Sequence, residues 1–378
     1  MLKVEKKVEY LELIYDLIFV YIIGRNNSLL HVAEGGFVPW QLFAAYILCT
    51  LAIIQIWTFS TFYINMFGRN GVREHIFLFI NMYLLYYIGE GTRQHWQSFH
   101  TQYHAAWALI LVNLGIQYLI ELKQCRGTKE IRTIRNMVIV LFGEAVLVLL
   151  AIPADGVSAP VFTTLAILYG MVMTWVFADE KKAELVDFGH LSERAMLYVV
   201  FTFGEMIITI SSYFDGELTV NSVYFSLMAF LIVVALFMSY EILYDHIIDR
   251  ELRTTGMAYM LIHIFLIFAM NNITTALTFM QDVTVSLMPK TVFLISAFLL
   301  FYICLFSMMR YAKKRMGLCL KFIMPPIVMS VVFVAAMLVF REQMYVNIAI
   351  SVVFVFAMLA RIWDRGTFTV SHLGGKSR

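Results

Sequence analysis

Five titratable residues lie inside long apolar stretches of the 378-residue sequence: Asp16, Glu144, Glu205, Glu241 and His263. In a helix, which rises about 1.5 Å per residue, Asp16 lies roughly 14 Å beyond its basic flank and Glu205 roughly 16 Å beyond its own. The other three fall near the same depth by the same count, and no Lys or Arg is predicted at that level. Unpaired carboxylates in the middle of a membrane suit a proton or a metal cation. The pattern therefore favours an ion path lined by these five residues.

A second interpretation of the same acids is structural. A charge at the centre of a membrane span costs about 2.5–3.5 kcal/mol on insertion scales, so each buried acid needs a stabilising feature. Each acid could be protonated, or hydrogen-bonded to a Ser, Thr, Asn or Tyr side chain, and serve helix packing alone. The sequence leaves both interpretations open.

Two pairs of acids have helical spacing. Glu12 and Asp16 are four residues apart, and so are Glu241 and Asp245. Residues at this spacing share one face of a helix, so each pair presents two carboxyl groups to the same neighbour. Both pairs lie toward the end of an apolar stretch that the charge distribution below assigns to the cytoplasm. Glu12 and Asp245 are therefore candidates for a cytoplasmic gate.

The segment His190 to Arg194 combines a histidine, Glu193 and an arginine at the start of another apolar stretch. His190 and Arg194 share a helix face. In one interpretation this is an ordinary helix start, with Arg194 reaching outward to lipid phosphate. In the other it is part of a cytoplasmic gate, in which Arg194 pairs with Glu12 or Asp245 on a neighbouring helix.

The elements that must position these residues are membrane-spanning helices. The chain is 61% hydrophobic and only 14% charged, well outside the range of soluble domains. A membrane span needs about 20 mainly apolar residues. Twelve such segments lie near 9–30, 38–66, 74–92, 102–122, 133–152, 158–178, 190–213, 219–244, 255–280, 288–310, 318–340 and 344–363. We therefore predict an all-α, polytopic bundle of about twelve transmembrane helices. It forms a single transmembrane domain, 1–378, without a soluble domain, in which the halves 1–185 and 186–378 are an open subdivision.

The basic residues test this assignment independently. If the connections between the twelve segments alternate sides, 24 of the 28 Lys and Arg residues lie on the side of the N-terminus. The four exceptions are Arg25, Arg93, Lys290 and Arg341. Because positive residues are retained in the cytoplasm, this side is the cytoplasm. The number of spans is even, so both termini are predicted to be cytoplasmic.

Two stretches resemble a known family. The segment 12–20, Glu-Leu-Ile-Tyr-Asp-Leu-Ile-Phe-Val, resembles the opening motif of the bacterial low temperature requirement protein A (LtrA) family, with Tyr15 in place of the usual Phe. The segment 190–194, followed after nine residues by Gly204 and Glu205, resembles its second signature. The resemblance implies a multi-pass protein of the bacterial inner membrane that is required for growth in the cold. It implies no settled substrate or reaction.

Sequence motifs of common enzymes are absent from the chain. It contains no HExxH, P-loop, GxGxxG or GxSxG motif, and its four cysteines have no metal-ligand spacing. We predict no catalytic residue, no cofactor, no metal site and no nucleic-acid partner, although the question of an enzyme stays open. Membrane lipids and a small ion or small-molecule substrate are the expected partners, and assembly into a homo-oligomer is left open.

The preferred function is therefore a secondary transporter or a proton- or cation-coupled carrier that uses carboxylates in the middle of the membrane. The alternative is a membrane-embedded lipid-handling protein or enzyme for cold adaptation of the bilayer. In that alternative, His190, Glu193 and Arg194 act near the cytoplasmic lipid headgroups.

Overall fold

The apolar stretches form helices in the computed structural model. It describes residues 6–30, 34–91, 96–125, 127–154, 158–177, 184–214, 218–280, 282, 284–314 and 320–373. The described residues contain twelve α-helices and no β-strand. In chain order the helices are α1 (Tyr10–Asn26), α2 (Trp40–Phe67), α3 (Val72–Gly91), α4 (Trp96–Leu122), α5 (Thr128–Ala151), α6 (Ser158–Val176), α7 (Phe188–Ile210), α8 (Val220–Ile242), α9 (Met257–Phe279), α10 (Leu287–Met308), α11 (Leu320–Val339) and α12 (Met344–Leu373). The predicted all-α class is confirmed.

Ten of these helices are long and apolar enough to cross a membrane, all except α1 and α3. α1 has 17 residues, the lower end of the range for a membrane span. α3 begins with the polar residues Arg73, Glu74 and His75. The protein is therefore a multi-pass membrane protein, with twelve helices of which ten meet both the length and the composition of a span.

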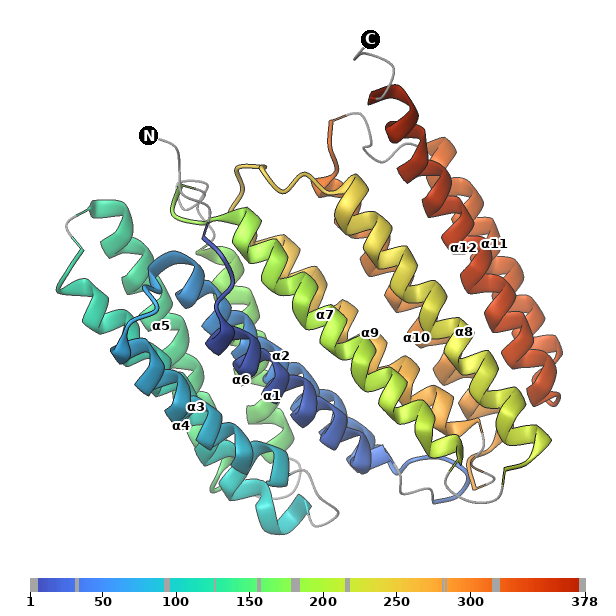
Figure 1. Ribbon diagram of the computed structural model, residues 1–378. Helices are drawn as coiled ribbons and strands as arrows, with labels where there is room; N and C mark the ends of the chain where they lie inside the picture. Colours follow the sequence, from blue (N-terminus) through green and yellow to red (C-terminus); the bar gives the residue numbers. More distant parts are fainter. Residues whose placement is uncertain are drawn as a thin grey trace. The chain divides into compact units, whose positions relative to one another are not determined.

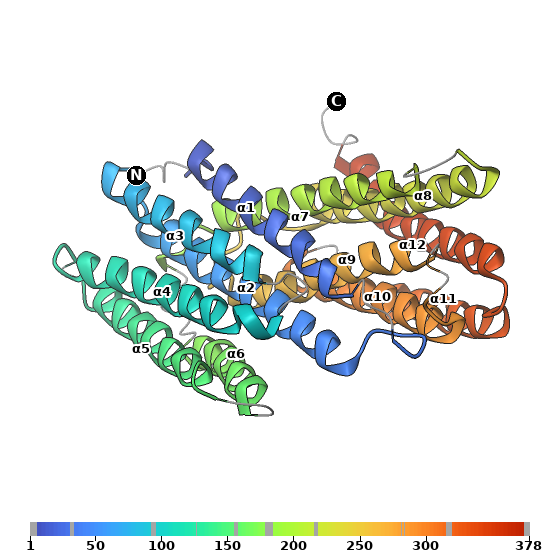
Figure 2. The same cartoon turned by 90° about the horizontal axis from the view of Figure 1, so that it is seen from below.

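The chain divides into two compact units. Unit 1 comprises Met1–Val32, Val38–Tyr198 and Glu251–Ile264, and unit 2 comprises Ala33–Phe37, Val199–Arg250 and Phe265–Arg378. In unit 1, α1 packs on α2 and α3, the helices α3 to α6 pack in sequence, and α2 also contacts α4 and α6 (Figures 1 and 2). In unit 2, α12 packs on α8 and α11, and α10 contacts α11.

Helix α2 is the most enclosed element of unit 1. Every residue from Ala52 to Asn65 is buried. Several of these residues are polar, among them Gln55, Thr58 and Asn65. Because buried polar groups need hydrogen-bond partners, polar side chains of neighbouring helices pair with those of α2. The candidate sites of unit 1 lie along this helix.

Candidate functional site: a buried charge cluster

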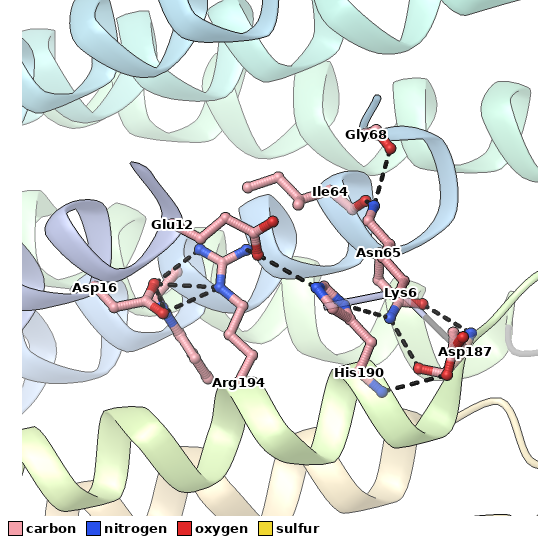
Figure 3. A network of polar contacts seen from close by, with 10 residues as sticks. Lys6, Glu12, Asp16, Ile64, Asn65, Gly68, Asp187, His190 and Arg194 are labelled. Atoms are coloured by element: carbon pink, nitrogen blue, oxygen red, sulfur yellow. Dashed lines mark hydrogen bonds and ion pairs between the residues drawn. The ribbon is translucent and has the colours of Figure 1, made fainter. Parts of the chain in front are cut away.

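Helices α1 and α7 each present two polar side chains one turn apart, and the two pairs face each other within unit 1. Figure 3 shows Glu12 and Asp16 of α1 lying beside Arg194 and His190 of α7. All four side chains are buried, with at most 4% of any residue exposed. We call this group the charge cluster. Its members stand four residues apart on each helix, so two matched helix faces build it.

Asp16 is the most tightly held member of the cluster. Its Oδ1 accepts hydrogen bonds from Arg194 Nη2 at 2.7 Å and from the indole Nε1 of Trp57 at 2.7 Å. Its Oδ2 accepts a further bond from Arg194 Nε at 3.1 Å. This two-point contact between guanidinium and carboxylate has the geometry that makes buried ion pairs favourable. Asp16 and Arg194 are therefore a fixed ion pair.

Glu12 is held more loosely than Asp16. Its Oε2 lies 3.5 Å from Arg194 Nη1 and 3.4 Å from His190 Nε2. These separations fit ion pairs but are long for hydrogen bonds. The cluster thus contains two carboxyl groups and one arginine, so its net charge depends on the protons carried by Glu12 and His190.

The orientation of His190 follows from Asn65 of α2 and Asp187, the residue before α7. The Asn65 amide is fixed by the Asp187 backbone: its Nδ2 donates to the Asp187 carbonyl at 2.8 Å, and its Oδ1 accepts from the Asp187 N–H at 3.1 Å. The same Nδ2 lies 3.0 Å from His190 Nδ1. Nδ1 must therefore be the acceptor, which assigns the ring proton of neutral His190 to Nε2, the nitrogen that faces Glu12.

Asp187 also caps helix α7. Its Oδ1 accepts a hydrogen bond from the backbone N–H of His190 at 3.2 Å, which satisfies one of the free donors at the helix start. The cap and the Asn65 contact together determine where His190 enters the cluster. An Asp three residues before His190 is a recognisable signal of a helix start.

A cavity of about 370 Å³ adjoins the cluster at Glu12. Both basic and acidic residues line it: Lys6, Lys7, Glu9, Glu12, Arg69 and Glu74. Lys6 donates to the carbonyl oxygens of Ile64 and Gly68 at the end of α2, the latter at 2.9 Å. Burial lowers the pKa of Lys6, against the opposing effect of Glu12. Glu12 is the member of the cluster that this cavity reaches.

Two sequence predictions about Arg194 are now decided. The predicted pairing with Glu12 is present, but the closer partner is Asp16, and Asp245 belongs to unit 2, where it is exposed. The prediction that no Lys or Arg lies at the depth of the acids was wrong for Asp16. The count along the backbone ignored the length of the arginine side chain, which lies within the protein instead of reaching toward lipid phosphate. That alternative for Arg194, fully buried at 0% exposure, is excluded.

The other predicted residues lie elsewhere. In unit 1, Glu144 and His263 are fully buried at separate positions, Glu144 beside Gln55 and His263 with its Nδ1 2.8 Å from the Tyr259 carbonyl. In unit 2, Glu205 is half-buried and Glu241 is exposed. The remaining residue of the second signature, Glu193, is half-buried in unit 1. Of the five residues predicted to line an ion path, Asp16 is the member of the charge cluster.

The sequence analysis missed Trp57 and Asn65. Both lie in the long apolar stretch of α2, where an indole and an amide at these positions carry no spacing signal. Their roles became visible only with their partners in place.

Replacing Trp57 with Phe is expected to lower the free energy of unfolding by about 1.5–3 kcal/mol, the range for a hydrogen bond to a charged group. The change removes the donor to Asp16 Oδ1 together with one ring of a fully buried side chain, so a cavity adds to the loss. The midpoint of thermal unfolding in detergent measures the effect. Trp175→Phe is the control, because this tryptophan is 51% exposed. Equal effects of the two changes would contradict a role for the Asp16 hydrogen bond.

Comparison with known proteins gives one result. The family model described as "Bacterial low temperature requirement A protein (LtrA)" matches residues 7–361. No curated protein and no solved structure matches the chain. The matched range contains the whole charge cluster and both stretches that resemble the family motifs. Because the match covers most of its length, the chain belongs to the bacterial low temperature requirement A protein family.

Proposed function

We propose that the protein is a proton-coupled secondary transporter of the bacterial inner membrane, and that the Glu12–His190 pair binds the coupled proton. The bacterial inner membrane follows from the family and from the many apolar helices. The observation that carries the proposal is the composition of the charge cluster. It buries two carboxyl groups and a histidine around one arginine.

The charge balance of the cluster supports proton binding. With both acids ionised and His190 neutral, the cluster carries one negative charge in a buried environment, which is costly. One added proton makes it neutral. Asp16 is tied to Arg194 and Trp57 and is therefore a poor site for that proton.

The geometry favours Glu12 as the site of the added proton. His190 Nδ1 already accepts from Asn65, whose amide the Asp187 backbone holds in place. A proton on His190 Nδ1 would face the N–H donor of Asn65 Nδ2, which is unfavourable. The added proton is therefore taken up by the Glu12 carboxylate. A neutral Glu12 keeps an acceptor oxygen that faces His190 Nε2–H, 3.4 Å away. Glu12 also borders the cavity of about 370 Å³, which offers a route for exchange with water.

The lipid-handling alternative receives less support from this geometry. It requires His190 and Arg194 to act at the level of the headgroups, but both side chains are buried and hold partners within unit 1. Only Glu193 of that group is partly exposed. The transporter proposal, in contrast, requires His190 and Arg194 to be buried, as they are in the structure.

The experiment is a flux measurement in proteoliposomes that contain a trapped pH-sensitive dye. A panel of amino acids, sugars, nucleosides, organic amines and inorganic cations is added outside. We expect at least one solute to drive proton movement through the wild-type protein, and Glu12→Gln to reduce that movement at least tenfold, because an amide cannot take up the proton. The matched control is Glu193→Gln, which changes an acid of the same family signature outside the cluster. Solute uptake that ignores an imposed pH gradient and is unchanged in Glu12→Gln would contradict the proposal.

A further inference from the structure

Another buried carboxyl group of unit 1 lies away from the residues of the charge cluster. Glu144 of α5 has no exposed surface. Its Oε2 accepts one hydrogen bond, from Gln55 Nε2 of α2 at 3.3 Å. The same nitrogen also donates to the Ile167 carbonyl of α6 at 3.2 Å. Three helices thus meet at this carboxyl group.

Gly170 of α6, which has no side chain, leaves room for the Glu144 carboxyl group. A Cβ atom at Gly170 of α6 would lie 1.9 Å from Glu144 Oε2 and 2.0 Å from Gln55 Nε2, so a side chain there would displace both groups. Gly170 therefore allows the acid and the amide to approach α6. The absence of a side chain at Gly170 thus accommodates both Glu144 and Gln55.

The site has many acceptors and few donors. Glu144 Oε1 and Gln55 Oε1 are buried and accept no hydrogen bond. The nearby hydroxyl groups of Thr58 and Thr174 donate to backbone carbonyls of their own helices, at 2.9 and 2.6 Å. Buried acceptors without donors are costly. The indole Nε1–H of Trp107 is a buried donor without a partner near Glu144, and a proton on Glu144 adds a second donor for the free acceptors.

The groups that face Glu144 offer no counter-charge. α2 presents Gln55, α4 presents the indole of Trp107, and α6 presents Gly170 and Tyr169, whose hydroxyl group donates to the Ile139 carbonyl at 3.1 Å. Among the described residues, none forms an ion pair with this carboxyl group. A buried carboxylate without a positive partner is unfavourable, and such groups take up a proton.

Water can reach the vicinity of the site. Gln55, Thr58, Gly170 and Thr174 line a cavity of about 30 Å³. A water molecule needs roughly 10–15 Å³ measured with a water-sized probe, together with polar partners, and this cavity offers both. Gln55 lines this cavity and donates to Glu144, so the cavity lies one contact away from the carboxyl group.

We infer that Glu144 is a second proton-binding site, protonated at neutral pH and in exchange with water through the cavity beside Gln55. The proton comes from water and forms an O–H bond on the carboxylate, so the charge of the site falls from minus one to zero. This inference concerns a different residue from the Glu12–His190 pair. It stands or falls independently of the transport proposal.

Infrared spectroscopy of the whole protein in lipid nanodiscs tests the inference. A protonated carboxyl group has a carbonyl stretching band separate from that of a carboxylate. We expect the wild-type spectrum at neutral pH to contain such a band, its intensity to fall in Glu144→Gln, and Glu144→Asp to restore a band at a different frequency. Transfer to D₂O should shift the Glu144 band to lower wavenumber, because the proton exchanges.

Glu90→Gln is the matched control. Glu90 forms an ion pair with Arg25 at 3.7 Å, so its replacement should leave the protonated-carboxyl band unchanged. The inference is overturned if the spectra of Glu144→Gln and the wild type agree in this region, since Glu144 would then be ionised. It is also overturned if the band keeps its frequency in D₂O, because the proton would then be locked away from water. Neither outcome depends on whether a transported solute has been found.

Discussion

Replacing Arg194 with Gln is expected to lower the free energy of unfolding by about 3–5 kcal/mol, the cost of breaking a buried ion pair by removing one partner. Asp16 would keep its hydrogen bond from Trp57 but lose both bonds from the guanidinium group. A loss of this size is comparable with the whole stability of many proteins. The yield of monodisperse protein and its thermal midpoint in detergent measure it.

The double variant separates the ion pair from the size of the side chain. Adding Asp16→Asn to Arg194→Gln removes the unpaired charge, so we expect the double variant to regain a large part of the lost stability. Arg194→Lys should be intermediate, because an ammonium group keeps the charge but not the two-point contact. If Asp16→Asn recovers nothing in the Arg194→Gln background, the buried pair is not the cause of the loss.

Replacing Gly170 with Ala is also expected to lower the free energy of unfolding, by about 1–3 kcal/mol from overpacking. The new methyl group would occupy the place of Glu144 Oε2 and Gln55 Nε2 and push α6 away from its neighbours. The measurement is again the midpoint of thermal unfolding. Combining Gly170→Ala with Glu144→Ala should return part of the loss, because the shortened side chain frees the space.

Gly204→Ala is the matched control for this change. Gly204 also lies within a helix, but a Cβ atom there meets no atom of the described residues within 4 Å. Alanine in an open helical position stabilises by about 0.5–1 kcal/mol. The two substitutions should therefore have opposite signs. A similar effect of both would show that the contact with Glu144 does not decide the role of Gly170.

Helix α2 donates hydrogen bonds to buried acids of two neighbouring helices. Trp57 donates to Asp16 on one side, and Gln55, two residues earlier, donates to Glu144 on another. Residues two apart point to different helix faces, so one buried helix serves two acids on different neighbours. A change in the position of α2 would alter both contacts at once.

The sequence alone determined the class of the protein and the faces of its helices. Apolar runs and the distribution of Lys and Arg are local properties, because each span must satisfy the length of the bilayer by itself. The spacing of Glu12 and Asp16, and of His190 and Arg194, is equally local, since four residues complete about one helical turn. The family motifs followed from the same residues.

Only the tertiary structure decided which helix faces meet. α1 and α7 are about 180 residues apart in the chain, and nothing in either segment names the other as its partner. Their contact turned Asp16 from an expected unpaired acid into half of an ion pair, and it left Glu12 as the cluster residue next to a cavity. Glu144, in contrast, is buried beside the Gln55 amide and Gly170, without a counter-charge. The physical reason is that burial and counter-charges belong to pairs of packed helices, whereas sequence spacing describes one helix at a time.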